Sequence, residues 1–398
     1  MTAIQVKPGI YWIGVNDRTT DLFEGLWPIT SEGVSYNAYV VKDEKSALID
    51  LAKDFKSNAL IDQIEEVVDP AALDYIVINH MEPDHTGVLR SLRRIAPNAT
   101  LLCTKRAEPL LENYYQITDK IQVVDDGDEI DLGTHKLQFH VTPMVHWPET
   151  MMTYETTEKV LFSCDAFGGY GALQGAVFDD QCRQLAYYEE QALRYYSNIV
   201  ALFARPVVRA IEKFKDVPLE VVAPSHGLIW RENPGRIVEL YQKWATYALE
   251  GPEVGVTLLY GTMYGNTEEM VEAVASGVAR AGVPLEIFDV RHIHASYILS
   301  SLYTRSGVLV GAPTYEGDLF PPMAYVLDIA ARKRIQNRKL GYFGSYGWSG
   351  GARREITKLA ETLKWDLTEG WEFPGGVTHA RLKEGEELGY RFAMSLQS

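Results

Sequence analysis

The chain has 398 residues, 46% of them hydrophobic, which suits two globular domains at about 100–200 residues per domain. Its formal net charge of −16 argues against nucleic acids and anionic membrane surfaces as partners. Three scattered cysteines are too few for a disulfide framework or an iron–sulfur cluster. The amino terminus has no apolar signal core, and no run of about 18 apolar residues occurs, so we expect a soluble, cytoplasmic protein.

The first informative segment in chain order is a cluster of potential metal ligands behind a short apolar run. Residues 74–78 are apolar and rich in β-branched side chains, which predicts a buried strand. The segment that follows, 79–85, holds two imidazoles and two carboxylates: His80, Glu82, Asp84 and His85. They should lie at the carboxyl end of the strand, where α/β folds hold their sites.

Three further potential ligands follow other strand-like runs in the same way. His146 follows residues 137–145, Asp165 follows 159–164 and His226 follows 219–225. Four predicted strand ends thus bring together four histidines and three carboxylates, which indicates a metal site. The other histidines are expected to be ordinary surface or core residues: His135, His140, His292, His294 and His379.

The pattern His-x-Glu-x-Asp-His with distant His, Asp and His resembles the metallo-β-lactamase fold family, whose zinc hydrolases carry His in place of Glu82. A carboxylate there makes the ligand set harder and more anionic, which suits iron or manganese better than zinc. The resemblance implies two metal ions bridged by Asp165. One would be held by His80, Glu82 and His146, the other by Asp84, His85 and His226. Whether the adjacent Asp84 and His85 both reach a metal is left open.

Candidates for a substrate pocket come from residues near these ligands. Trp147 follows His146 and is expected to wall the site or to face a flavin. Tyr195 and Tyr196 lie on a helical stretch, where either core packing or a phenol supplied to the pocket would account for them. Glu24, in the loop 21–25, is a candidate proton donor.

A domain boundary is expected after residue 250. Residues 234–250 form a plausible helix that opens with proline, and Gly251-Pro252 ends it. The predicted domains are 1–250 and 253–398. The second has a repeated strand–loop–helix rhythm, as in a doubly wound parallel sheet.

Three loops of the second domain follow predicted strands (255–260, 306–311 and 339–343) at one edge of the sheet. The first loop, 261–267, precedes a predicted helix over 268–281, and its hydroxyls and amides suit either a phosphate or an ordinary capped helix start. The loops 312–317 and 344–350 combine glycine with an aromatic that can cover a flat ring. The basic run 332–339 lies at the opposite edge and is expected to be a solvated helix end.

This trio of loops resembles the flavodoxin family and implies bound FMN. By resemblance, one loop holds the phosphate: Thr262, Met263, Tyr264, Gly265, Asn266 and Thr267. The second flanks the ring: Pro313, Thr314, Tyr315, Glu316 and Gly317. The third consists of Ser345, Tyr346, Gly347, Trp348, Ser349 and Gly350, with Trp348 near the isoalloxazine.

The whole chain therefore resembles the flavodiiron protein family (A-type flavoproteins): a metallo-β-lactamase-like αββα sandwich followed by a flavodoxin-like doubly wound parallel sheet. The family implies FMN, a diiron centre and reduction of dioxygen to water or of nitric oxide to nitrous oxide. It also implies a head-to-tail homodimer or a dimer of dimers. No C-x-x-C pairs of a fused rubredoxin occur, so we expect a separate electron donor, such as rubredoxin. The alternative is a zinc hydrolase of the lactamase type with a flavodoxin domain as redox sensor.

Overall fold

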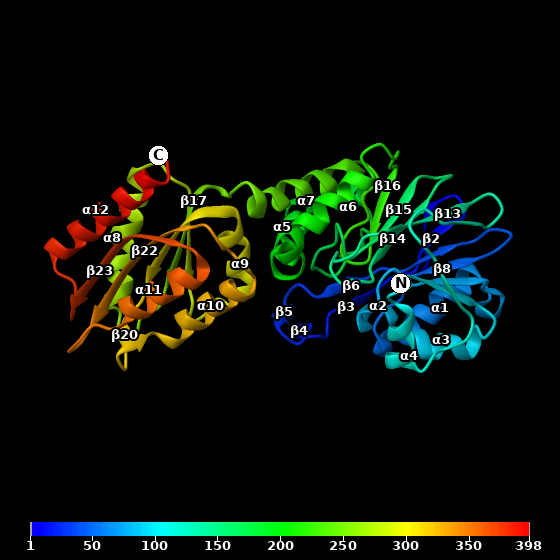
Figure 1. Cartoon of the computed structure of the whole chain (residues 1–398), viewed down its shortest axis with the longest axis horizontal. Helices are drawn as coiled ribbons and strands as arrows, with labels where there is room; N and C mark the ends of the chain where they lie inside the picture. Colours follow the sequence, from blue (N-terminus) through cyan, green and yellow to red (C-terminus); the bar gives the residue numbers. More distant parts are fainter. Residues whose placement is uncertain (1, 398) are drawn as a thin grey trace. The chain divides into compact units, whose positions relative to one another are not determined.

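The computed structural model describes residues 2–397, and the chain divides into two compact units, one up to Ala245 and one from Thr246 (Figure 1). The division falls within α7 (Pro234–Leu249), whose first-turn proline forfeits no helical hydrogen bond. Among the described residues no helix is both long and apolar enough to cross a bilayer.

Two sheets form the centre of the first unit. The larger has the order β1-β2-β7-β8-β9-β10-β11 and the smaller the order β12-β13-β14-β15-β16. The larger consists of β1 (Ile4–Lys7), β2 (Ile10–Trp12), β7 (Tyr39–Val41), β8 (Ala47–Ile49), β9 (Tyr75–Val77), β10 (Thr100–Cys103) and β11 (Ile121–Val123). The smaller consists of β12 (Glu129–Asp131), β13 (Lys136–Val141), β14 (Met151–Glu155), β15 (Val160–Cys164) and β16 (Val221–Pro224). Two further pairs complete the strands of this unit: β3 (Val15–Asp17) with β6 (Val34–Tyr36), and β4 (Leu22–Phe23) with β5 (Trp27–Pro28).

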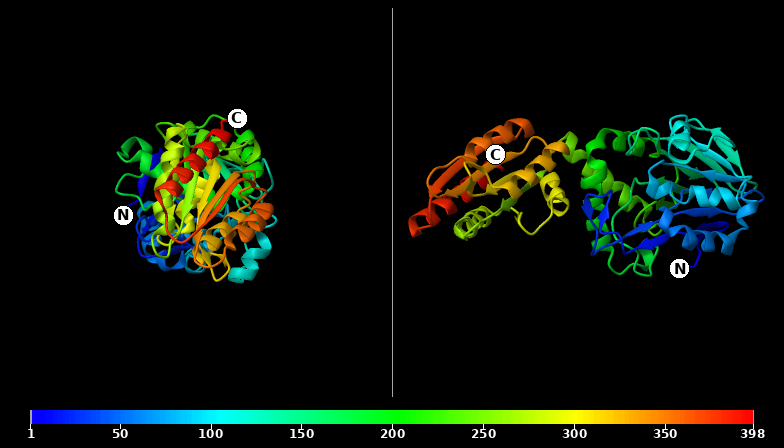
Figure 2. Two further views of the ribbon diagram at one scale, coloured as in Figure 1. Left: turned by 90° about the vertical axis from the view of Figure 1, so that its left-hand side faces the viewer. Right: turned by 90° about the horizontal axis from the view of Figure 1, so that it is seen from below.

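Helices cover the two sheets from opposite sides, as Figures 1 and 2 show. On one side lie α1 (Ser57–Val67), α3 (Leu89–Ile95) and α4 (Glu108–Tyr115), and on the other α6 (Ala204–Lys213) and α7. The remaining helices are the short α2 (Pro83–Thr86) and α5 (Leu185–Tyr195). Every residue of β14, β15 and β16 is buried, as expected for strands enclosed on both faces. The predicted αββα sandwich is confirmed.

The strand predicted over residues 137–145 is shorter than expected. It ends at Val141, because Pro143 has no N–H to donate to a sheet and Met144 has a positive φ of 66°. The residues before His146 therefore form a loop.

The second unit contains a five-stranded parallel sheet with the order β18-β17-β19-β22-β23, the doubly wound order of flavodoxins. Its strands are β17 (Glu253–Tyr260), β18 (Leu285–Asp289), β19 (Arg305–Gly311), β22 (Lys339–Tyr346) and β23 (Asp366–Pro374), with the small pair β20 (Thr314–Tyr315) and β21 (Asp318–Leu319) at its edge. The helices are α8 (Asn266–Arg280), α9 (Ala295–Thr304), α10 (Pro321–Arg332), α11 (Ala352–Leu363) and α12 (His379–Ser395). The flavodoxin-like fold is confirmed.

Two features of this unit differ from the sequence predictions. Strand β22 continues to Tyr346, so the first three residues of the predicted loop 344–350 belong to the strand. The basic run 332–339 is not wholly solvated, because the Arg338 side chain is buried. Its guanidinium donates to the carbonyl oxygens of Leu302 and Tyr303 at 3.0 and 2.8 Å.

Helices α8 and α12 share one face of this sheet and touch through glycines. A Cβ built on Gly277 of α8 would lie 1.9 Å from the backbone oxygen of Glu386, and one on Gly389 of α12 would lie 2.1 Å from that of Val274. Backbone atoms cannot rotate away as a side chain can. The two helices can therefore approach this closely only without side chains at these positions.

Gly277→Ala is expected to destabilise the second unit by about 1–3 kcal/mol, because the added methyl forces the helices apart. Thermal unfolding followed by circular dichroism measures the effect. Ser276→Ala, on the exposed side of the same helix, is the matched control and should change the free energy of unfolding by no more than about 0.5 kcal/mol. Equal stability of the two variants would contradict the close helix contact.

Candidate functional site

The seven predicted ligands meet around Asp165, which directly follows β15. Its Oδ2 lies 3.5 Å from Nε2 of His80 and 3.3 Å from Nε2 of His146. Its Oδ1 lies 3.0 Å from Nε2 of His85 and 3.2 Å from Nε2 of His226. One carboxylate thus presents a separate oxygen to each of two pairs of imidazoles.

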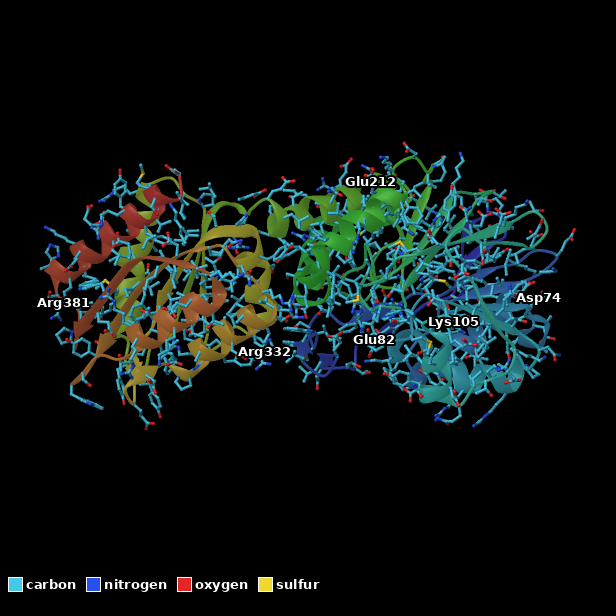
Figure 3. All side chains as sticks on the ribbon, viewed as in Figure 1. Asp74, Glu82, Lys105, Glu212, Arg332 and Arg381 are labelled. Atoms are coloured by element: carbon cyan, nitrogen blue, oxygen red, sulfur yellow. The ribbon has the colours of Figure 1, made fainter. Side chains whose placement is uncertain are left out.

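The first group of ligand atoms is completed by Glu82, which Figure 3 labels. Its Oε2 lies 3.3 Å from Nε2 of His80 and 3.1 Å from Nε2 of His146. The four ligand atoms of His80, Glu82, His146 and Asp165 lie within 4.8 Å of one another. Ions bound at about 2.1 Å in tetrahedral or octahedral geometry place neighbouring ligand atoms roughly 3.0–3.4 Å apart, so this group has the spacing that a metal ion requires.

The second group contains both of the adjacent residues Asp84 and His85. Oδ1 of Asp84 lies 3.4 Å from Nε2 of His85, and Oδ2 of Asp84 lies 3.4 Å from Nε2 of His226. The ligand atoms of Asp84, His85 and His226 lie within 4.8 Å of one another, so both adjacent side chains are placed to reach one ion. The Cys164 thiol also lies near His85 and Asp165.

The hydrogen bonding of these side chains is incomplete without a cation. Within residues 2–397, no hydrogen-bond partner exists for either carboxylate oxygen of Asp84, for Oδ2 of Asp165, or for Nε2 of His85 and His226. All of these atoms are buried, and a buried polar atom without a partner costs about 1–3 kcal/mol. One cation within each group would satisfy these atoms, so the residues fit a pair of metal ions.

The charges of the cluster also favour bound cations. Burial by itself lowers the pKa of His80, yet the hydrogen bonds to Glu149 and Glu82 raise it to about 10. Burial likewise opposes the charged form of His226, but Asp165 and Asp84 raise its pKa to about 10. The carboxylates therefore create a site that strongly favours positive charge.

The outer contacts of the ligands were not predicted from the sequence. Nδ1 of His80 lies 2.7 Å from Oε1 of Glu149, and Nδ1 of His226 lies 2.7 Å from the carbonyl oxygen of Ser35. Asp50 accepts hydrogen bonds at 2.9 Å from the backbone and side-chain N–H groups of Asn79, which fixes the segment that carries four ligands. Position in the loop after His146 was the only available signal for Glu149.

Aromatic rings surround the ligands. The Trp147 ring packs edge-on against His80, with ring centroids 5.0 Å apart, and the Phe23 ring packs in the same way against His226 at 5.5 Å. Tyr195 donates a hydrogen bond from its hydroxyl to Oδ1 of Asp165 at 2.9 Å. Burial raises the pKa of this phenol well above its ordinary value, so the hydroxyl keeps its proton.

The other two pocket candidates have partners outside the two ligand groups. Tyr196 packs against Tyr241 and Trp244 in the core. Glu24 is exposed, and its carboxylate accepts a hydrogen bond from Nε1 of Trp27 at 3.0 Å. Its neighbour Phe23, the last residue of β4, contacts His226 of the site.

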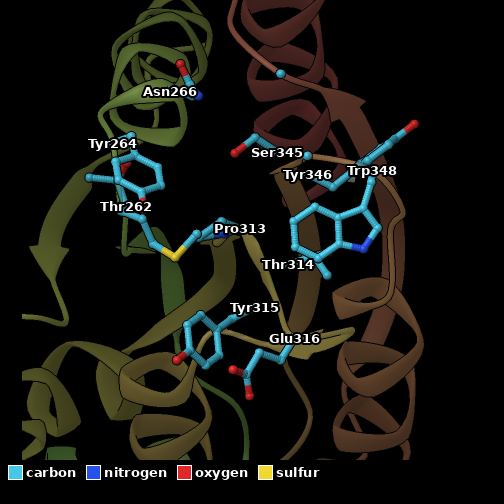
Figure 4. Close-up of a pocket in the computed structure, with 13 residues that line it drawn as sticks. Thr262, Tyr264, Asn266, Pro313, Thr314, Tyr315, Glu316, Ser345, Tyr346 and Trp348 are labelled. Atoms are coloured by element: carbon cyan, nitrogen blue, oxygen red, sulfur yellow. The ribbon is translucent and has the colours of Figure 1, made fainter.

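The second unit contains a cavity of about 380 Å³ between its three predicted loops, within the usual size range of cofactor sites (Figure 4). Its lining includes Thr262, Met263, Tyr264, Asn266, Pro313, Thr314, Tyr315, Glu316, Ser345, Tyr346, Gly347 and Trp348. The rings of Tyr264 and Trp348 stand on opposite sides of it and are 88% and 90% exposed. A flat ring placed between them would cover much of this aromatic surface.

The remaining predicted flavin residues shape the loops without lining the cavity: Gly265, Thr267, Gly317, Ser349 and Gly350. Gly265 has a positive φ of 91° and donates to Oγ1 of Thr262 at 3.0 Å, which closes the turn before α8. Thr267 is buried, and its hydroxyl lies 3.2 Å from that of Ser345. Gly375, which follows β23, also lines the cavity and was not predicted.

Comparison with known proteins agrees with both units. Residues 34–227 match the model of the ODP family beta lactamase, and residues 258–390 match that of flavodoxin. An anaerobic nitric oxide reductase flavorubredoxin of Shigella dysenteriae is 36% identical over 403 residues, covering 99% of this chain and 83% of that protein. The chain belongs to the flavodiiron protein family. The anaerobic nitric oxide reductase flavorubredoxin of Pectobacterium carotovorum is 37% identical to this chain, covering 98% of this chain and 79% of that protein.

Solved flavodiiron structures superimpose on the entire chain. The rubredoxin oxygen:oxidoreductase of Desulfovibrio gigas has a TM-score of 0.93 at 30% identity, covering 100% of this chain and 99% of that one. The flavodiiron protein of Giardia intestinalis has a TM-score of 0.94 at 26% identity, covering 100% and 97%. This member of the flavodiiron family is accordingly an oxidoreductase.

Glu82→His in this flavodiiron protein is expected to make zinc the major bound metal and to abolish reductase activity. The imidazole removes a negative charge and softens the ligand set. Elemental analysis of protein produced with iron and zinc both available measures the change. Glu112→His, the same substitution at an exposed position, is the control and should leave the metal content as it was. Unchanged iron content and turnover in Glu82→His would contradict the assignment.

Proposed function

We propose that this chain reduces dioxygen to water, nitric oxide to nitrous oxide, or both, at two iron ions in the first unit, with electrons arriving through FMN in the second. The observation that carries this proposal is Asp165, whose two oxygens face two separate groups of ligands. His80, Glu82 and His146 would hold one ion, and Asp84, His85 and His226 the other. Four imidazoles and three carboxylates are a hard, anionic set that suits iron.

The electron count fits two cofactors of this kind. Dioxygen needs four electrons and four protons to give two waters, and two molecules of nitric oxide need two electrons and two protons to give nitrous oxide and water. FMN supplies two electrons that can pass singly, and a diferrous pair stores two more. The three loops that line the cavity of the second unit, including Thr262 and Trp348, would hold the flavin.

The residues around the ligands have distinct parts in this chemistry. Phe23 and Trp147 pack on the imidazoles from the outside and exclude bulk water from the ligands. The protonated hydroxyl of Tyr195 lies 2.9 Å from Oδ1 of Asp165, where it can stabilise negative charge on the carboxylate that both groups share. Glu24, exposed and directly after Phe23 in the chain, remains a candidate for proton delivery from solvent.

The electron donor that we propose is a rubredoxin. Two proteins similar to this chain carry that partner in their names, a flavorubredoxin and a rubredoxin oxygen:oxidoreductase. The zinc-hydrolase alternative is not favoured, because these proteins are reductases and Glu82 stands among the ligand atoms.

Protein purified without air is expected to contain about two irons and one FMN per chain, by elemental analysis and flavin absorbance. With reduced rubredoxin as donor, gas electrodes should then record consumption of dioxygen or nitric oxide. Removal of iron with a chelator under reducing conditions should abolish consumption and leave the flavin spectrum unchanged. Zinc in place of iron would refute the proposal and restore the hydrolase alternative.

We further propose that the active form is a head-to-tail homodimer, as in the family that the sequence resembles. The flavin and the irons belong to different units, so a second copy would bring the FMN of one chain to the irons of the other. Tyr264 and Trp348 are exposed at the flavin cavity, and the parts of their rings that a flavin leaves uncovered are apolar surface of the kind that a partner chain covers.

Dilution tests the dimer directly. Specific activity is expected to fall as the protein is diluted until sedimentation velocity shows monomers, while iron and FMN remain bound. Monomers that keep full activity would contradict the proposed dimer without affecting the cofactor assignment.

A further inference from the structure

Three histidines of the candidate site differ in the hydrogen-bond partner of Nδ1, the ring nitrogen that faces away from the ligand groups. Nδ1 of His80 is hydrogen-bonded to a carboxylate, that of Glu149, at 2.7 Å. Nδ1 of His226 is hydrogen-bonded to a neutral backbone carbonyl, that of Ser35, also at 2.7 Å. Nδ1 of His85 has no hydrogen-bond partner in the part of the chain that is described.

Glu149 is held firmly for this contact. Its side chain is 1% exposed, and the same Oε1 that meets His80 accepts a hydrogen bond from the backbone N–H of Met81 at 3.1 Å. Its own carbonyl oxygen accepts from the hydroxyl of Thr104 at 2.8 Å, which fixes the backbone at this position. The carboxylate thus has a defined place behind His80 and no contact with the second ligand group.

This contact determines how His80 can act. With Nδ1 donating its proton to Glu149, Nε2 faces the ligand atoms of Glu82 and Asp165, which lie 3.3 and 3.5 Å away, and would offer its lone pair to an ion held among them. A carboxylate behind a ligating imidazole also increases its basicity, and the loss of such a partner typically lowers metal affinity by about 10–100-fold.

We propose that Glu149 is a positioning residue that makes the two ion sites unequal, so that the ion at His80, Glu82 and His146 is held more tightly than the one at Asp84, His85 and His226. This inference rests on the proposed dinuclear centre. Each site has one carboxylate of its own and shares Asp165, so these charges do not distinguish them. Glu149 is hydrogen-bonded to a ligand of the first site, whereas Asp50, the other buried carboxylate nearby, is hydrogen-bonded to Asn79 and Ser225 rather than to a ligand.

Glu149→Gln tests the proposal, because glutamine keeps the size and a hydrogen-bond acceptor but removes the charge. Iron-loaded protein is titrated without air against a chelator that forms a coloured complex with ferrous iron. The wild-type chain is expected to release its two irons at well-separated chelator concentrations. In Glu149→Gln the tighter iron should be released at a chelator concentration about 10-fold lower, with the weaker iron unchanged. Mössbauer spectra should show one of the two iron signals altered.

Two further variants keep the result interpretable. Glu155→Gln removes a carboxylate with 0% exposure whose Oε1 lies 3.0 Å from Nδ1 of His135, a histidine outside both ligand groups, and should leave both irons in place. Glu149→Asp keeps the charge at a greater distance and should give an intermediate release curve. It also tests the proposal if Glu149→Gln fails to fold.

The outcomes separate this inference from the proposed function. Release curves for Glu149→Gln that match the wild type, or that shift equally for both irons, would overturn the inequality while the dinuclear centre stands. Loss of iron from Glu155→Gln as severe as from Glu149→Gln would also overturn it, because general loosening of the unit would explain both. A wild-type chain that binds no pair of irons would remove the proposed function together with this inference.

Discussion

All four histidines of the candidate site direct a ring nitrogen at one buried carboxylate, that of Asp165. This arrangement concentrates Asp165, Glu82 and Asp84 in a region with almost no access to water. Such a concentration of negative charge is costly unless cations share the space. The surrounding structure can be understood as the means of holding these groups together: buried strands end at the site, and Asp50 and Glu149 fix the ligand segment from behind.

The two units place their functional residues in the same way, although their sheets differ. In each, the functional residues follow the carboxyl ends of strands, where successive connections converge and backbone and side chains are free to face a ligand. In the first unit, charged groups from several strand ends meet in a small buried volume. In the second unit, glycines, hydroxyl groups and aromatic rings from three loops surround an open cavity.

The sequence was sufficient to predict that residues with unusual chemistry at the end of an apolar run lie together, as the seven side chains around Asp165 and most of the cavity lining do. The sequence was insufficient for side chains whose contacts are with residues far away along the chain. Glu149 is a single acid in a loop, and nothing in its spacing indicates that it meets His80. Tyr195 is the last residue of α5, and its hydrogen bond to Asp165 joins two elements that are 30 residues apart in the sequence. Arg338 was expected in solvent because it is charged, yet its several donors satisfy backbone carbonyls in the interior.

The ligands come from four separate segments between residues 80 and 226, and this has a consequence for the folding of the first unit. Two metal ions bound there would cross-link distant parts of the chain as a disulfide does. For a closed loop of this size, the loss of conformational entropy in the unfolded chain would stabilise the folded state by about 5 kcal/mol. That is comparable to the whole stability of many domains. Iron would therefore be a structural component as well as a reactant, and cellular iron supply would set how much of the protein persists folded.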